Sequence, residues 1–154
     1  MKLLNKILVI FFTLLFSTNL AISGEKWDMA LAYGAGNFHS ANATAFAKSV
    51  TEKSGGKLTI VTHPGGSLYK GGEIFRAVRT GQAQIGERFM SALGKEDPLL
   101  EVDSQPFLAT SYNDAMKLYK ASKPEIVKGL DAKGLVFLYA VPWPAQGLYS
   151  KKEI

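Results

Sequence analysis

The chain has 154 residues, a length typical of one domain, and a formal net charge of +5. It contains no cysteine and only two histidines, His39 and His63. Disulfides and thiolate metal sites are therefore excluded, and the spacing of the histidines does not suggest a metal site. The basic residues form no face with interleaved aromatic residues, so nucleic acid is not an expected partner.

The first 23 residues have the pattern of an export signal. Residues 1–6 form a short basic segment. Residues 7–16 form an apolar core that is too short to span a bilayer comfortably. Ala21 and Ser23 are small residues with the spacing of a cleavage site, which predicts cleavage after Ser23. An uncleaved N-terminal anchor helix is the alternative, although the polar residues 17–19 end the apolar run early. Export without cysteine favours a bacterial periplasm, with a mature chain of residues 24–154.

The next segment alternates short apolar runs with helical patterns. Residues 26–33 predict a strand that places Trp27, Met29 and Leu31 on one face. Residues 40–54 predict a helix that is capped by Ser40 or Asn42 and ends at the glycines 55–56. Residues 58–63 are rich in β-branched side chains and predict a second strand.

The middle of the chain predicts shorter elements. Residues 73–80 form a short helical pattern that ends at Gly81, and residues 83–86 predict a short strand. Residues 91–112 are irregular because Pro98 and Pro106 interrupt any helix.

Two helices and a last strand are predicted toward the end of the chain. Ser111 and Asp114 form a capping box at the start of a helix over residues 111–121. A second helix follows over residues 124–132, with its proline in the first turn. Residues 134–141 are apolar on both faces, which predicts a buried central strand.

This order of elements predicts an α/β fold with a mostly parallel sheet. Ligands bind such sheets outside the carboxyl ends of the strands. Three loops satisfy this condition, at residues 34–39, 64–72 and 87–92, and residues 142–147 form a fourth. Helix N-termini expected at Ser40 and Gly72 would favour an anion there.

The residues of these loops allow two other interpretations, a dinucleotide-binding turn and a hydrolase site. Gly34 and Gly36 begin a dinucleotide-binding pattern, but His39 replaces its third glycine and no acid ends the second strand. Glu96 and Asp97, or His39, could serve a secreted hydrolase. The adjacent acids before Pro98 are more typical of a solvated turn, so we expect no enzyme and no cofactor.

Polar and aromatic side chains gather on the same loops and predict a recognition surface. His39 could instead form a hydrogen bond at a helix start, Arg88 could pair with Glu87 or Asp97, and Trp143 could fill the edge of a core. The candidate ligand-binding residues are Asn37, Phe38, His39, Tyr69, Arg88, Phe89, Trp143 and Gln146.

Three blocks carry a resemblance to a known family: "SGGKLTIVTHPGGSLYKGGEIFRAVRTGQAQIGE", "EDPLLEVDSQPFLATSYNDAMKLY" and "GLVFLYAVPWPAQGLYSKKEI". With them the chain resembles the dicarboxylate-binding, extracytoplasmic solute-binding proteins of tripartite ATP-independent periplasmic (TRAP) transporters. The resemblance implies a two-lobed, type II-like periplasmic binding protein. Such a protein closes on an organic acid without catalysis and delivers it to a membrane permease. A sensor kinase as partner is the alternative.

The resemblance also implies a domain organisation and two departures. Residues 1–23 would be the signal peptide and residues 24–141 the N-terminal lobe. Residues 142–154 would begin the hinge to a second lobe that is largely missing, together with the family's carboxylate-binding arginine. Arg88 follows "GE" where relatives often have phenylalanine, and Gln146 stands at a basic position of some members. Because later sequence would cover residues 135–141, we expect exposed apolar surface there.

Overall fold

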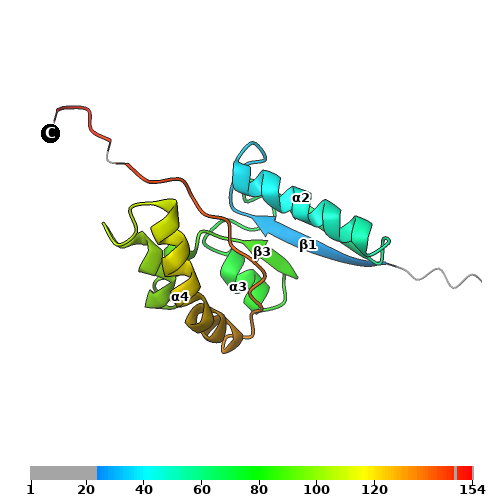
Figure 1. The fold of residues 1–154 in the computed structure, drawn as a ribbon. Coiled ribbons are helices and arrows are strands. Elements are labelled where there is room, and N and C mark those ends of the chain that lie inside the picture. The colour runs from blue at the N-terminus through cyan, green and yellow to red at the C-terminus, as the bar shows by residue number, and fades with distance from the viewer. Residues whose placement is uncertain (1–23, 148, 154) are drawn as a thin grey trace, which may run out of the picture.

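The computed structural model describes residues 24–147 and 149–153, so the predicted export signal with cleavage after Ser23 lies outside the described residues. Within these ranges, no helix combines the length and apolar character needed to cross a membrane. The elements in chain order are β1 (Glu25–Leu31), α2 (Phe38–Lys53), β2 (Leu58–His63), α3 (Ile74–Arg79), β3 (Ile85–Glu87), the 3-10 helices η1 (Met90–Leu93) and η2 (Pro98–Ser104), and α4 (Tyr112–Asp131) (Figure 1).

The three strands form one parallel sheet in the order β2-β1-β3, which confirms the predicted α/β class. Ala30 of β1 is in register with His63 of β2, and Leu31 is in register with Glu87 of β3. The carboxyl ends of all three strands therefore meet at the same edge of the sheet. As predicted, Trp27, Met29 and Leu31 share the face that packs on α2.

Helices α2 and α3 cover opposite faces of this sheet. On one face, Ile85 packs with residues of β1, β2 and α2. The next residue, Gly86, points the other way, because a Cβ atom added there would lie 2.5 Å from Cγ2 of Ile74 in α3. The chain thus leaves β1 toward one face, into α2, and leaves β2 toward the other, into α3. The strand order β2-β1-β3 reverses there, and α/β sheets bind ligands outside the carboxyl ends of the strands at such a reversal.

A second hydrophobic core joins α3 to the later part of the chain. Four buried side chains form its centre: Phe75, Leu100, Ile126 and Leu130. Leu135 and Phe137, which follow α4, pack against this core. The chain after α4 then runs beside the sheet toward the start of α2 (Figure 1).

The helices differ from the prediction in two places. The first helix begins at Phe38 because Asn37, rather than Ser40 or Asn42, caps it with its side-chain oxygen. The predicted helices 111–121 and 124–132 form one helix, α4, with Pro124 inside it. Buried Ile126 and Leu130 anchor the part of α4 beyond the proline in the second core. Ser111 caps α4 as predicted by accepting a hydrogen bond from the N–H of Asp114.

The prediction of a buried central strand at residues 134–141 is wrong. This segment has no regular secondary structure and is not part of the sheet. Leu135 and Phe137 face the second core, whereas Val136 and Leu138 are 80% and 53% exposed. An apolar run such as this one can form a strand that is covered on both faces or a segment that is covered on one face. The composition of the run does not distinguish the two.

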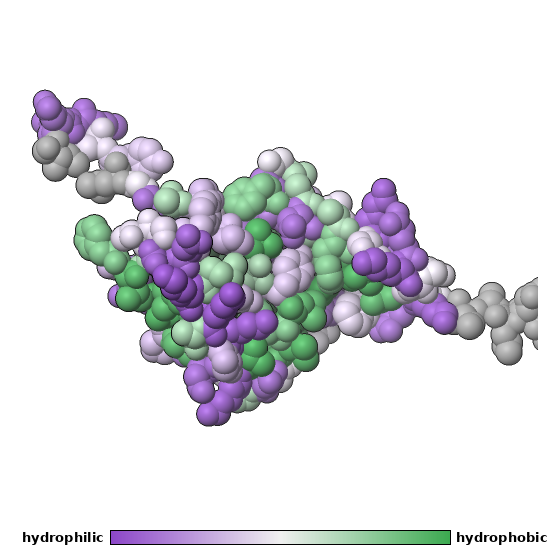
Figure 2. All heavy atoms as spheres, viewed as in Figure 1, coloured by the Kyte–Doolittle hydropathy of each residue, from purple (hydrophilic) through white to green (hydrophobic). Residues whose placement is uncertain are grey.

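Apolar side chains are exposed on this molecule, within residues 135–141 as the sequence predicted and also outside them. They gather on the chain after α4 and on the loop and helix before it: Phe107, Leu108, Tyr112, Met116, Val136, Leu138 and Tyr139. Figure 2 shows hydrophobic residues in several patches on one face, between clusters of hydrophilic residues.

Gly86 gives a first test of this packing. Gly86→Ala should lower the free energy of unfolding by about 1–3 kcal/mol, because the new methyl group would press on Ile74 and Val78 of α3. Urea unfolding followed by circular dichroism measures this. Gly72→Ala is the matched control, since no atom lies within 4 Å of a Cβ atom added there. Equal stability of the two variants would contradict the packing of α3 on Gly86.

Candidate functional site

The loop after β1 is held in place by the backbone carbonyl of Tyr33. This oxygen accepts a hydrogen bond from Oγ of Ser40 at 2.7 Å and another from the N–H of Gly65 at 2.7 Å. The N–H of Gly66 also donates to the carbonyl of Leu31 at 2.9 Å. Gly65 and Gly66 both have positive φ angles, which glycine adopts without steric cost. The start of α2 and the loop after β2 are thus fixed to the end of β1.

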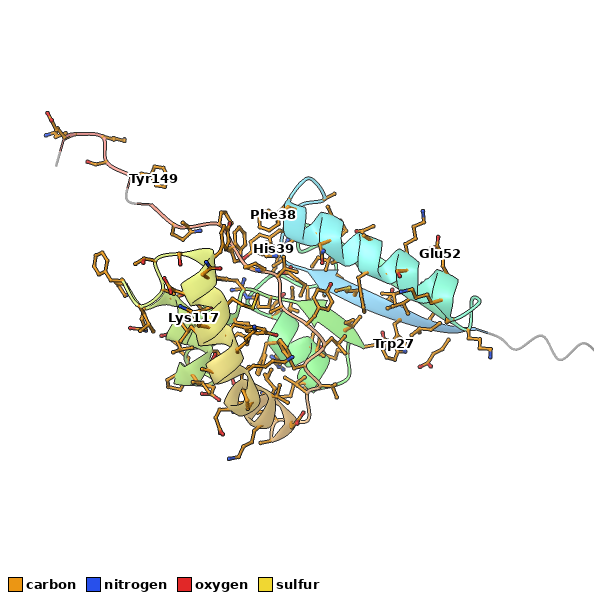
Figure 3. All side chains as sticks on the ribbon, viewed as in Figure 1. Trp27, Phe38, His39, Glu52, Lys117 and Tyr149 are labelled. Atoms are coloured by element: carbon orange, nitrogen blue, oxygen red, sulfur yellow. The ribbon has the colours of Figure 1, made fainter. Side chains whose placement is uncertain are left out.

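Five aromatic rings meet above this edge of the sheet, and we call them the aromatic cluster: Tyr33, Phe38, His39, Phe89 and Trp143. The ring centroid of Trp143 lies 4.2 Å from that of His39 and 6.0 Å from that of Phe89. Trp143 belongs to the chain after α4, which passes beside Phe38 and His39 at the start of α2 (Figure 3). The cluster therefore joins segments that follow β1, β3 and α4.

His39 is a buried polar member of the aromatic cluster, with 5% of its surface exposed. Its backbone N–H donates to Oδ1 of Asn37 at 2.9 Å, a hydrogen bond at the start of α2 that does not involve the imidazole. Its ring atom Nε2 is buried and has no hydrogen-bond partner among the described residues. Burial lowers the pKa of the imidazole, so the ring stays neutral near pH 7.

Glu87 ends β3 at the same edge of the sheet. Its atom Oε2 is buried, and within the described part of the chain it has no hydrogen-bond partner. Burial raises the pKa of this carboxyl group, while the backbone N–H of Ala32 and the positive charge of Arg88 act in the opposite direction. Burial also raises the pKa of the Tyr33 hydroxyl, and the charge of Glu87 adds to that effect. Glu87, Arg88 and Tyr33 therefore lie close enough for their charges to interact.

Arg88 extends toward the loop after β2. A Cβ atom added at Gly71 would lie 3.0 Å from Nη1 of Arg88 and 3.5 Å from Cβ of Ala32, so the guanidinium packs in the space that glycine leaves. Nε of Arg88 is also buried without a hydrogen-bond partner among residues 24–147 and 149–153. The described residues include no ion pair of Arg88 with Glu87 or Asp97.

The structure thus brings four of the predicted site residues into the aromatic cluster, with the ring of Trp143 paired to each of the other three: Phe38, His39, Phe89 and Trp143. Asn37 lies beside them as the cap of α2. Tyr69 donates a hydrogen bond to the carbonyl of Gln82 at 3.4 Å. Gln146 is exposed and donates to the carbonyl of Pro144 at 3.1 Å.

The helix start expected at Gly72 offers no anion site. Helix α3 has only six residues and begins at Ile74, and the residue before it is the acidic Glu73. The carboxylate of Glu73 accepts the N–H of Lys70 at 2.8 Å. A negative charge already occupies this helix end.

The acids considered for hydrolysis have structural partners. Glu96 forms an ion pair with Arg79 at 3.6 Å, and Asp97 caps η2 by accepting the N–H of Leu99 at 3.0 Å. The described residues include no group of three or more potential metal ligands.

Sequence reasoning missed Tyr33 and Glu87 as members of the site. Both end an apolar run, as residues at the carboxyl ends of strands do. Their proximity follows from the register that pairs Leu31 with Glu87, which no local pattern reveals.

Comparison with known proteins identifies relatives of this chain. The sequence model of DctP, described as bacterial extracellular solute-binding protein, family 7, matches residues 31–148. Among curated proteins, the C4-dicarboxylate-binding protein DctB of Bacillus subtilis (strain 168) is 36% identical over 97 residues. That alignment covers 57% of this chain and 28% of DctB.

Two solved structures share the fold at higher identity. A TRAP solute-binding protein from a marine metagenome, specific for pyroglutamate and holding co-purified pyroglutamate, is 58% identical with a TM-score of 0.83. The match covers 86% of this chain and 43% of that one. DctP6 of Bordetella pertussis, an extracytoplasmic solute receptor that binds pyroglutamic acid, is 50% identical with a TM-score of 0.76. There the match covers 77% of this chain and 40% of the other, so this chain spans less than half of each relative.

The cap of α2 gives a test of how the site is positioned. Asn37→Ala should lower the free energy of unfolding by about 1 kcal/mol, because the N–H of His39 loses its acceptor. Asn37→Asp keeps an acceptor oxygen, so its free energy of unfolding should remain close to that of the original protein. Chemical denaturation of the three proteins measures the difference. If the alanine variant is as stable as the aspartate variant, the cap does not hold the start of α2.

Proposed function

Because the chain belongs to family 7 of the bacterial extracellular solute-binding proteins, we propose that it captures a small organic acid in the periplasm and delivers it to the membrane subunits of a TRAP transporter. The observation that carries this proposal is the identity of 58% and 50% with two receptors that bind pyroglutamate. Pyroglutamate, a five-membered lactam with one carboxylate, is accordingly the ligand we propose first.

The geometry of the site supports a small cyclic ligand. The aromatic cluster and the polar side chains of Glu87 and Arg88 lie at the carboxyl edge of the sheet, where the strand order β2-β1-β3 reverses. Sites for small molecules combine apolar and aromatic walls with a few polar groups that orient the ligand. Aromatic faces suit the flat ring of a lactam, and Arg88 suits an anionic or carbonyl oxygen.

We propose the following roles for the parts of the chain. Residues 24–141 would form one wall of the ligand site, and residues 142–154 would begin the connection to the opposite wall, with Trp143 between them. Residues 1–23 would direct export to the periplasm and be removed. The ligand contacts would be Phe38, His39, Arg88, Phe89 and Trp143, while Asn37 holds the start of α2.

Binding of pyroglutamate tests this function directly. The protein produced from its complete gene should bind pyroglutamate with a dissociation constant on the order of micromolar or tighter, which corresponds to about −8 kcal/mol. Isothermal titration calorimetry measures this. Pyrrolidinone, the same lactam ring without a carboxylate, is the control ligand and should bind far more weakly. An absence of heat with pyroglutamate and with every acid of an organic-acid panel would overturn the proposal.

A substitution at Gly71, against which the guanidinium of Arg88 packs, tests the role of Arg88 in ligand binding. Gly71→Ala should weaken pyroglutamate binding by about tenfold, equal to about 1.4 kcal/mol, because the methyl group would push the guanidinium aside. The displaced group is the end of a flexible side chain, so stability should change little. Gly72→Ala is the neighbouring control, with open space around its added Cβ atom. Calorimetry on both variants measures the effect, and equal affinities would show that Arg88 does not orient the ligand.

A further inference from the structure

Three buried polar atoms at the carboxyl edge of the sheet lack hydrogen-bond partners among the described residues: Oε2 of Glu87, Nε of Arg88 and Nε2 of His39. Native proteins leave few buried polar atoms unpaired, and those that remain call for an explanation. The three differ in chemistry. A carboxylate oxygen accepts, an arginine nitrogen donates, and a neutral imidazole nitrogen does either according to its tautomer.

These atoms belong to one site rather than to three unrelated places. Glu87 is in register with Leu31, two residues before Tyr33, and the charges of Glu87 and Arg88 both act on the Tyr33 hydroxyl. The ring of His39 lies 6.1 Å from the ring of Tyr33 and 4.2 Å from that of Trp143. An acceptor and a donor at the end of β3 and an adaptable group at the start of α2 therefore lie near Tyr33 at the same edge of the sheet.

An acceptor is an unusual group in a site for organic acids. The oxygens of a simple dicarboxylate only accept hydrogen bonds, so they cannot satisfy Oε2 of Glu87, and two negative charges would lie close together. A lactam acid differs because its ring N–H is a donor, while its ring carbonyl and its carboxylate are acceptors. Its three polar groups match an acceptor and two donors, which Glu87, Arg88 and His39 can supply.

We infer that Glu87 determines the specificity of this site by accepting the ring N–H of a lactam acid at its unpaired oxygen. The inference rests on the proposed function and adds to it the residue that distinguishes a cyclic amide from acids without an N–H. Arg88 and His39 then face the ligand's acceptor oxygens, and the aromatic cluster covers the ring.

The sharpest test pairs a change in the ligand with a change in the protein. The lactone analogue of pyroglutamate has an oxygen in place of the ring N–H, so it would present an acceptor to the carboxylate of Glu87. The protein from its complete gene should prefer the lactam by about 10- to 100-fold, since a lost hydrogen bond to a charged group leaves that group unsatisfied. Calorimetry with both ligands gives this ratio without any substitution.

The substitution Glu87→Gln then assigns the preference to one side chain. Glutamine keeps the size of glutamate and can present either a carbonyl or an N–H, so it can pair with the lactam or with the lactone. The preference should fall to about threefold or less. Glu52→Gln, which makes the same change near the far end of α2 from His39 (Figure 3), should keep the full preference.

The outcomes separate this inference from the proposed function. A preference that collapses in Glu87→Gln and persists in Glu52→Gln supports it. An equal affinity of the unsubstituted protein for lactam and lactone overturns the inference and leaves the capture of organic acids standing. A preference that survives Glu87→Gln overturns it as well. If the unsubstituted protein binds no acid, the proposed function fails first, and the inference fails with it.

Discussion

The carbonyl oxygen of Tyr33 is the point on which the geometry of the site depends. It accepts one hydrogen bond from Ser40 at the start of α2 and one from Gly65 in the loop after β2. The two bonds use both lone pairs of one backbone oxygen, so they fix a helix and a loop to the same strand end. With this position fixed, the rings of Tyr33 and His39 face Trp143, although more than a hundred residues separate them from it in sequence.

The topology of the sheet explains why polar and aromatic groups gather at that place. Helix α2 follows β1 and α3 follows β2 on opposite faces, so the strand order reverses in the sheet β2-β1-β3, and ligands bind α/β sheets outside the strand ends at such a reversal. Glu87 and Arg88 stand where β3 ends, and the chain after α4 crosses this edge and places Trp143 on it. The same arrangement leaves buried polar atoms facing aromatic rings. A rigid scaffold of three short strands thus positions side chains from distant parts of the chain.

Much of the fold follows from the sequence, and the exceptions have a common cause. The strand at residues 58–63 was predicted correctly, and so was the buried face of β1 with Trp27, Met29 and Leu31. Both features depend on neighbours in sequence. The strand predicted at residues 134–141 failed because the number of covered faces depends on distant segments. Phe38, His39, Phe89 and Trp143 were all predicted for the site, yet the grouping of the other three rings around Trp143 was not. Glu87 was missed because its importance follows from strand register and burial, which appear only in three dimensions.

The segment after α4 also has a consequence for how this polypeptide behaves in solution. Residues 135–141 are uncharged, lack proline and are rich in β-branched and aromatic side chains, yet they are not hydrogen-bonded into the sheet. Val136 and Leu138 present apolar side chains to solvent on one face of this stretch. A run of this composition with free backbone groups can template cross-β association between molecules. The segment that leads to Trp143, and that packs on the second core through Leu135 and Phe137, is thus prone to self-assembly where it is uncovered.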